Sequence, residues 1–186
     1  ELVLGWYADR REAIRKAKPN AAHISISNFQ KLFRHSIVIT QNVDGLHERA
    51  GNKSIYELHG NIHRHKCNGC GKQVELSNKK MRMLNYCECG GKIRPDVVWF
   101  GESLPLQMIN EAFETVSSCD LMFTIGTSAQ IYPAAQLPFE AKSKGAYVIE
   151  INPEPTPFSP KADLSIHDDA GSALPKFYEE IHAQLN

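Results

Sequence analysis

Three short apolar segments, each ending in a polar motif, constrain the fold of this chain more than any other feature. Residues 36–40, 121–125 and 146–151 are rich in aliphatic side chains and are followed by Gln-Asn-Val-Asp, Gly-Thr-Ser and Asn-Pro-Glu, respectively. Apolar segments of this length are typical of parallel strands that are buried on both faces. Polar residues that follow such strands lie at the carboxyl edge of the sheet, where α/β proteins bind ligands.

Helical segments separate these predicted strands. Residues 105–118 and 133–144 lie between them, and residues 6–18 and 21–33 form two further segments with helical spacing of apolar residues. Asn20 is the expected N-cap of the segment 21–33, because its side chain can accept a hydrogen bond from the first helical turn. The repetition of strand, polar loop and helix predicts an α/β fold with a doubly wound, Rossmann-like parallel sheet.

The sequence changes character between residues 63 and 95, where Cys, Gly, Lys and Asn replace most apolar residues. A segment with so few apolar residues cannot build its own core, so a metal must hold it together. It contains a Cys-x-x-Cys pair and a Cys-x-Cys pair, and we expect all four to bind one structural zinc ion: Cys67, Cys70, Cys87 and Cys89. Reactive or merely buried thiols are the alternative. The fifth cysteine, Cys119, is expected to belong to the core.

These patterns divide the chain into three parts. Residues 1–62 are expected to form the first part of the Rossmann-like domain with a helical segment of the small domain, residues 63–95 the inserted zinc-binding module, and residues 96–186 the second part of the Rossmann-like domain.

The composition limits the partners of the chain. Its 21 basic and 21 acidic residues balance, which leaves no net field to attract nucleic acid or an anionic membrane. It contains no apolar run long enough to span a bilayer. Paired cysteines with metal-ligand spacing favour a reducing compartment, so we expect a cytoplasmic location. The alternative is a transit peptide removed ahead of Glu1.

The first polar motif carries side chains suited to binding a sugar. Gln41, Asn42 and Asp44 offer amide and carboxylate groups to ribose hydroxyls or to an amide of a ligand. Loop capping through Asx-turns is the alternative, because it is common for residues of this type.

The other two motifs suit a phosphate and a second ribose. Gly126, Thr127 and Ser128 can present N–H groups and hydroxyls to a phosphate at the start of a helix. Asn152 and Glu154 follow another strand, where a polar side chain can reach the ribose of a dinucleotide.

One histidine stands out as a candidate base. His59 lies between Leu58 and Gly60, just after a strand that is expected to begin near Ile55. An imidazole in this place can act as a base near neutral pH. A hydrogen-bonded structural histidine is the alternative.

Residues 94–102 form an extended apolar segment. Pro95 within it argues against a central strand, because proline cannot donate a hydrogen bond to a neighbouring strand. An exposed extended segment can accept a peptide as an added strand. Val97, Val98 and Phe100 can instead pack at the junction between the domains.

Tyr7 and Arg10 are three residues apart in a predicted helix and therefore lie on one face. A phenol and a guanidinium on one face can bind the same carboxylate. The alternative is a solvated charged face, with Tyr7 packed against the core.

In combination, these motifs resemble the sirtuins, a family of NAD-dependent protein-lysine deacylases. The resemblance extends over nearly the whole chain. It rests on residues 19–23, 40–47 and 57–60, on the cysteine pairs, on Val-Val-Trp-Phe-Gly-Glu at 97–102, on Gly-Thr-Ser and Asn-Pro-Glu, and on residues 170–171. Most sirtuins have two residues between the cysteines of the second pair, whereas this chain has one.

The resemblance implies roles for individual residues. NAD is consumed as a co-substrate, zinc is structural, and the partners are acylated-lysine proteins or peptides. His59 and Asn42 correspond to catalytic residues, and His47 to the lesser histidine of the motif. The residues implied in NAD binding are Gln41, Asn42, Asp44, Gly126, Thr127, Ser128, Asn152, Pro153, Glu154 and Ala170. Those implied in substrate binding are Val97, Val98, Phe100 and Gly101.

The pair Tyr7 and Arg10, followed by Arg11, resembles the pair with which some sirtuins bind the distal carboxylate of succinyl or malonyl groups. The resemblance therefore implies a desuccinylase or demalonylase. It leaves acetyl-lysine open as a further substrate.

The resemblance fails at the start of the chain. Sirtuins begin with a Gly-Ala-Gly turn and a Gly-Ile-Pro-x-Phe-Arg loop that hold the pyrophosphate and the nicotinamide ribose, and neither occurs here. We expect the chain to be a fragment of a longer protein. The alternatives are a degenerate member with impaired NAD binding, or a catalytically silent zinc-containing module that binds acyl-lysine peptides or other proteins.

Overall fold

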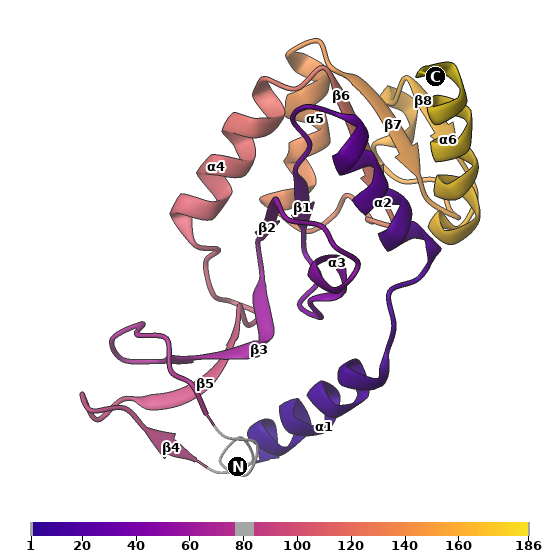
Figure 1. Cartoon of the computed structure of the whole chain (residues 1–186). Coiled ribbons are helices and arrows are strands. Elements are labelled where there is room, and N and C mark those ends of the chain that lie inside the picture. Colours follow the sequence, from indigo (N-terminus) through magenta and orange to yellow (C-terminus); the bar gives the residue numbers. More distant parts are fainter. Residues whose placement is uncertain (1, 77–83, 186) are drawn as a thin grey trace.

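The computed structural model describes residues 2–76 and 84–185 (Figure 1). Its first two helices are α1 (Leu2–Lys16) and α2 (Ala21–Leu32). The Asn20 side chain accepts a hydrogen bond from the backbone N–H of His23 at 3.2 Å and caps α2. The predicted pair of helices and the predicted cap are therefore confirmed.

The larger part of the molecule is built around five short strands that pair in parallel within two sheets. They are β1 (Val38–Thr40), β2 (Ile55–Glu57), β6 (Leu121–Ile125), β7 (Tyr147–Ile151) and β8 (Leu164–Ile166). Hydrogen bonds join β1 to β2 in one sheet and β6, β7 and β8, in that order, in another. The three apolar segments found in the sequence thus form β1, β6 and β7.

Helices cover both faces of the β6–β7–β8 sheet. On one face, Val148 of β7 belongs to a core with α4 (Leu106–Ser117) and α5 (Leu137–Ser143). On the other, Ile149 and Ile151 pack in a core with α2 and α6 (Ala170–Leu185). Side chains alternate between the faces of a strand, so β7 contributes to both cores. This arrangement confirms the predicted doubly wound, Rossmann-like fold.

Short elements complete the core. A four-residue helix, α3 (Leu46–Arg49), follows the first polar motif. Two 3₁₀ helices, η2 (Ala134–Gln136) and η3 (Ser159–Lys161), lie before α5 and before β8. Among residues 2–76 and 84–185, no helix combines the length and the apolar character needed to cross a lipid bilayer.

A small antiparallel sheet lies apart from the parallel strands, next to α1 (Figure 1). It contains β3 (Gly60–Cys67), β5 (Lys92–Val97) and β4 (Asn85–Tyr86), with β5 in the centre. The predicted zinc-binding module, residues 63–95, includes residues 77–83, which lie outside the described part of the chain.

The expectation that the segment around Pro95 avoids a central strand is wrong. Pro95 lies in β5, the central strand of the small sheet. Proline is tolerated there because β4 pairs only with Lys92 and Ile93 of β5 and does not reach Pro95. At Pro95 only β3 pairs with β5, through His65, so the missing N–H of proline costs no ladder bond with β4.

Gly60 is required where β3 leaves the parallel core. Its φ is +78°, and a Cβ atom at this position would lie 2.1 Å from the carbonyl oxygen of Asp96. Only glycine therefore fits between His59 and the backbone of β5.

Helix α1 is attached to the small sheet by a buried contact. Arg11, which is 2% exposed, donates a hydrogen bond from Nη1 to Nε2 of His65 in β3 at 2.6 Å. Burial, together with the charge of Arg11, lowers the pKa of His65 to about 4, so the ring is neutral and can accept this bond.

Candidate functional site

His59 is held by the loop that follows β1. Its Nδ1 atom lies 3.0 Å from the backbone oxygen of Gln41. Because a carbonyl oxygen only accepts hydrogen bonds, Nδ1 must carry the proton. The other ring nitrogen, Nε2, is then unprotonated in the neutral ring and can act as a base.

Further contacts connect the loop of Gln41 with the ends of β6 and β7. The Gln41 Nε2 atom lies 3.5 Å from Oγ1 of Thr127, and Asn152 donates a hydrogen bond from Nδ2 to the Thr127 backbone oxygen at 2.8 Å. With the contact to His59, these bonds join residues at the carboxyl ends of β1, β2, β6 and β7. The carboxyl ends of the two parallel sheets therefore bring four residues together: Gln41, His59, Thr127 and Asn152.

The Gly-Thr-Ser motif does not start a helix, contrary to the prediction. Residues after Ser128 form a turn, and the next helical residues are those of η2 and α5. A phosphate at this position would meet loop N–H groups and hydroxyls rather than the N-terminus of a helix.

Four motif residues at this edge are exposed and open to a ligand: Gly126, Ser128, Pro153 and Glu154. Ala170 is half-buried as the first residue of α6.

Asp44 caps its own loop through an Asx-turn, which was the alternative to ligand binding for this motif. Its Oδ1 atom accepts a hydrogen bond from the backbone N–H of Leu46 at 2.9 Å, which is an Asx-turn. Its backbone oxygen lies 3.3 Å from Nε2 of His63. Asn42 is exposed in the same loop, and its amide is open to a ligand. The structure thus favours a structural role for Asp44 and leaves Asn42 available.

His47 lies in a different environment from His59. Its ring packs against that of His23, with the ring centroids 4.8 Å apart. Burial and the neighbouring His23 lower the pKa of His47, against an opposing effect of Asp44. His47 is therefore a neutral, packed residue at pH 7.

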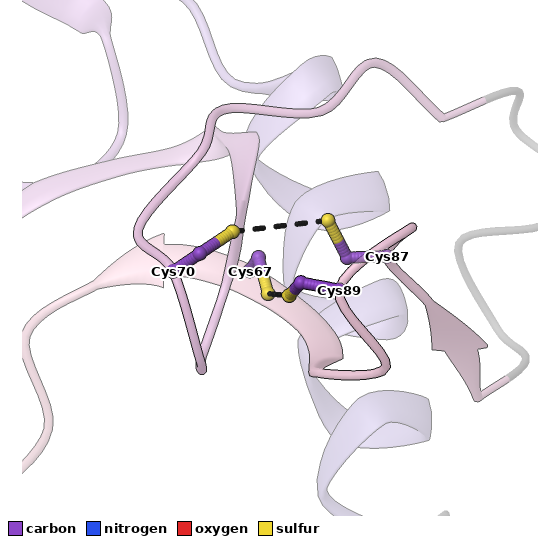
Figure 2. A group of neighbouring side chains, drawn as sticks. All are labelled: Cys67, Cys70, Cys87 and Cys89. Carbon is purple, nitrogen blue, oxygen red and sulfur yellow. Dashed lines mark hydrogen bonds between the residues drawn. The ribbon is translucent and has the colours of Figure 1, made fainter.

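The four paired cysteines converge on one point (Figure 2). All four Sγ atoms lie within 4.8 Å of one another, with 3.4 Å between Cys67 and Cys89 and 3.8 Å between Cys70 and Cys87. Tetrahedral zinc with Zn–S bonds of about 2.3 Å places its sulfur atoms roughly 3.8 Å apart. The cluster therefore fits zinc, and the single residue between Cys87 and Cys89 does not prevent convergence. With all four positions taken by protein, such an ion is structural.

Local backbone groups support this metal site. Hydrogen bonds from the backbone N–H of Cys70 and, to a smaller extent, of Gly69 lower the pKa of the Cys67 thiol and favour the thiolate that zinc requires. A Cβ atom on Gly91 would lie 2.5 Å from the Cys67 sulfur, so glycine is needed there. Cys119 lies outside the cluster, half-buried against the core, as expected.

Residues 94–102, the predicted substrate segment, are partly buried and partly exposed. Val97 is buried, and the N–H of Val98 donates a hydrogen bond to the His59 backbone oxygen at 3.0 Å. The segment is therefore directly attached to the residue that carries the candidate base. Phe100 is fully exposed, so the packing alternative holds for Val97 and not for Phe100.

Three residues of this region that the sequence did not single out order the segment. Arg94 forms a two-pronged ion pair with Glu102, and its guanidinium lies 4.2 Å from the centroid of the Trp99 ring. Burial tends to raise the pKa of Glu102, but hydrogen bonds from the Trp99 N–H and from Arg94 outweigh this effect. The pKa is therefore lowered, and Glu102 stays ionised. No periodic pattern marks such a pair in an extended segment. Its only sequence signal is a basic residue and an acidic residue at the two ends of a mostly apolar stretch.

Tyr7 of α1 packs onto this group. Its ring is stacked on Trp99, with a centroid distance of 6.3 Å and an interplanar angle of 18°. Partial burial raises the pKa of Tyr7, so its hydroxyl stays protonated and able to donate at neutral pH. Arg10 is exposed one turn further along the helix.

Comparison with known proteins identifies the family. The Sir2 family model matches residues 3–133. The NAD-dependent protein deacylase of Aquifex aeolicus is 45% identical over 183 residues, which cover 97% of this chain and 77% of that protein. A solved Sir2 homologue in complex with NAD has 40% identity and a TM-score of 0.93, over 99% of this chain and 73% of the other. A solved Sir2 protein bound to an acetylated peptide has 35% identity and a TM-score of 0.85, over 91% and 74%.

The chain belongs to the Sir2 family, which confirms the resemblance read from its motifs.

Proposed function

We propose that this protein is an NAD-dependent protein-lysine deacylase that prefers succinyl-lysine or malonyl-lysine and whose partners are acylated-lysine proteins and peptides. The observation that carries the proposal is the hydrogen bond from His59 Nδ1 to the Gln41 backbone oxygen. This bond leaves Nε2 as a base at the edge of the sheet where the NAD-binding motifs meet. The family's relatives support the choice of reaction, because they are named NAD-dependent protein deacylases.

The reaction needs one base and two binding surfaces. The acyl oxygen of the modified lysine attacks the ribose carbon that bears nicotinamide, and the bond to nicotinamide breaks. His59 then removes a proton from a ribose hydroxyl, whose oxygen attacks the resulting imidate. Water releases free lysine and O-acyl-ADP-ribose. NAD is therefore a substrate that the reaction consumes.

The exposed polar groups at the sheet edge are suited to hold NAD. The Gln41 backbone oxygen binds His59 and the exposed Asn42 follows it in the chain, so both are near the position where the nicotinamide ribose must be placed for His59 to act. Gly126, Ser128 and Glu154 are exposed at the ends of β6 and β7 and would face the rest of the dinucleotide. The solved relative in complex with NAD supports this assignment.

The acylated peptide is placed along the segment that follows β5. Val98 is bonded to His59 through the backbone, and exposed Phe100 and Gly101 follow it. A peptide that adds to this segment brings its modified lysine close to the base. The relative bound to an acetylated peptide supports a peptide partner of this kind.

Tyr7 and Arg10 supply the acyl preference in this proposal. They lie three residues apart in α1, so they share a helix face. The Tyr7 hydroxyl is protonated at neutral pH and can donate, while the Arg10 guanidinium supplies a positive charge. A distal carboxylate of a succinyl or malonyl group can bind both, whereas an acetyl group has no carboxylate to bind.

Nicotinamide release tests the proposed reaction. We expect the full-length protein to release nicotinamide from NAD when a succinyl-lysine peptide is present, and not with the unmodified peptide. Binding of the acyl peptide without nicotinamide release would instead identify a silent binding module. A cytoplasmic location remains part of the proposal, since zinc-binding thiols must stay reduced.

Replacing Arg10 with methionine is expected to lower kcat/KM for desuccinylation at least roughly tenfold and to spare deacetylation. A charge-assisted hydrogen bond contributes about 1.5–3 kcal/mol, and about 1.4 kcal/mol corresponds to one decade. The measurement is kcat/KM on matched succinyl and acetyl peptides.

Lys16→Met is the matched control, because Lys16 is on the same helix and its contact with Glu12, at 3.7 Å, is a surface ion pair of small value. We expect both activities of this control to stay within about twofold. An equal loss of both activities in Arg10→Met would show that Arg10 is structural.

A further inference from the structure

Trp99 contacts both a fixed cation, Arg94, and Tyr7, the residue proposed to recognise the acyl carboxylate. The Arg94 guanidinium is 4.2 Å from the centroid of its ring, and the Tyr7 ring is stacked on it at 6.3 Å. Tyr7 belongs to α1, whereas Arg94 and Trp99 belong to β5 and the segment after it. The Trp99 indole therefore connects helix α1, which carries Tyr7 and Arg10, with the substrate segment.

Arg94 is held rigidly beneath this ring. It is only 7% exposed, and its donors are directed at acceptors on three different residues. Nε bonds to the Asn68 side chain at 2.9 Å, Nη1 to the Val97 backbone oxygen at 2.8 Å, and Nη2 to both carboxylate oxygens of Glu102. Because the guanidinium is planar and its donors have fixed directions, these bonds define the orientation of the group. A ring that packs on this cation is fixed with it.

The backbone of Trp99 is fixed by the same acid. Its N–H donates a hydrogen bond to Oε2 of Glu102 at 3.0 Å, and Glu102 in turn binds Arg94. Glu102 therefore holds the main chain of Trp99 while Arg94 holds its ring. Both restraints come from the substrate segment and neither comes from α1.

We propose that Trp99 is a positioning residue for acyl selectivity: it holds the Tyr7 phenol where the hydroxyl can meet the distal carboxylate of a succinyl or malonyl group. This inference rests on the proposed function and adds a residue that does not itself touch the carboxylate. Its effect is confined to acyl groups with a carboxylate, because an acetyl group makes no use of the Tyr7 hydroxyl. A misplacement of about 1 Å is enough to lower a rate strongly.

Steady-state kinetics of Trp99→Leu tests the proposal. We expect KM for a succinyl-lysine peptide to rise roughly tenfold while kcat/KM for the acetyl-lysine peptide stays within about threefold. Trp6→Leu is the matched control: Trp6 also contacts the Tyr7 ring, edge-on at 5.0 Å, but it is 59% exposed. We expect both activities of Trp6→Leu to stay within about twofold. Equal losses on the two peptides in Trp99→Leu would overturn the proposal.

A double-mutant cycle with Tyr7→Phe separates positioning from general packing. Tyr7→Phe keeps the stacked ring and removes the hydroxyl that Trp99 is proposed to place. In the Tyr7→Phe background, Trp99→Leu should therefore raise KM for the succinyl peptide less than about twofold further. Additive effects of the two substitutions would show that Trp99 does not act through the Tyr7 hydroxyl.

Tryptophan fluorescence gives a test that does not depend on how well Trp99→Leu folds. Residues 1–186 contain two tryptophans, so in a protein of these residues Trp6→Phe leaves Trp99 as the single reporter. A saturating succinyl peptide should change the emission of Trp99 more than a saturating acetyl peptide does. Identical changes with both peptides would contradict the proposal. Absence of any deacylation by the unaltered protein would instead refute the proposed function on which it rests.

Discussion

Replacing His59 with alanine is expected to lower the rate of product formation by roughly two to four decades, the usual contribution of a general base. The base acts after nicotinamide has left, so exchange of free nicotinamide into NAD should fall less than formation of O-acyl-ADP-ribose. Both rates are measured with the same succinyl peptide. His35→Ala is the control, because His35 is exposed and lies before β1.

Two outcomes would decide against this role of His59. Near-normal product formation in a folded His59→Ala protein would exclude it as the base. Equal losses of exchange and product formation would place its contribution before or at the expulsion of nicotinamide. A thermal melt of the variant confirms that the fold is kept.

Replacing Cys67 with serine is expected to remove the zinc and unfold the small sheet. Cys67 is 1% exposed and its sulfur lies 3.4 Å from that of Cys89, so the substitution removes one of the four converging sulfur ligands from the interior of the cluster. Zinc binding by four such ligands contributes about 10–16 kcal/mol, as much as the whole stability of a typical domain. The measurements are zinc content per chain and thermal unfolding.

Cys119→Ser is the matched control for the zinc site. Its thiol donates to the Val116 backbone oxygen at 3.3 Å and lies outside the cluster. We expect this variant to keep one zinc per chain. The assignment fails if carefully purified protein contains no zinc, or if Cys67→Ser melts at the same temperature as the unaltered protein.

The sequence was sufficient to predict the elements that depend on local pattern. β6 and β7 follow from aliphatic runs that end in polar motifs, and the start of α2 follows from the capping ability of Asn20. The metal site followed from spacing alone, because two short cysteine pairs have few other uses in a segment without a core.

What could not be predicted depends on contacts between distant segments. Pro95 is accommodated in a central strand because its neighbour β4 ends its pairing at Ile93, and no local pattern contains that information. Trp99 stacks on Tyr7 only because the fold brings α1 next to the small sheet. Likewise Glu150 is a carboxylate within an apolar strand, where it is buried because the hydroxyls of Thr156, Ser159 and Ser165 bind it.

The same distinction applies to the candidate site. The motifs predicted which residues lie at the sheet edge, but the structure was needed to show that His59 binds the Gln41 backbone through Nδ1. It also separated Asp44, which makes an Asx-turn, from the exposed Asn42 in the same motif. Residue type and spacing therefore located the site, while tertiary contacts distinguished the residues that hold it together from those open to a ligand.

A competition assay tests whether the protein is a deacylase that prefers succinyl-lysine. The full-length protein is given NAD and an equimolar mixture of succinyl-lysine and acetyl-lysine peptides of the same sequence, and the ADP-ribose products are identified by mass spectrometry. We expect O-succinyl-ADP-ribose to form first and in excess, in a one-to-one ratio with nicotinamide. Formation of O-acetyl-ADP-ribose alone, or of no acyl-ADP-ribose from either peptide, would contradict it.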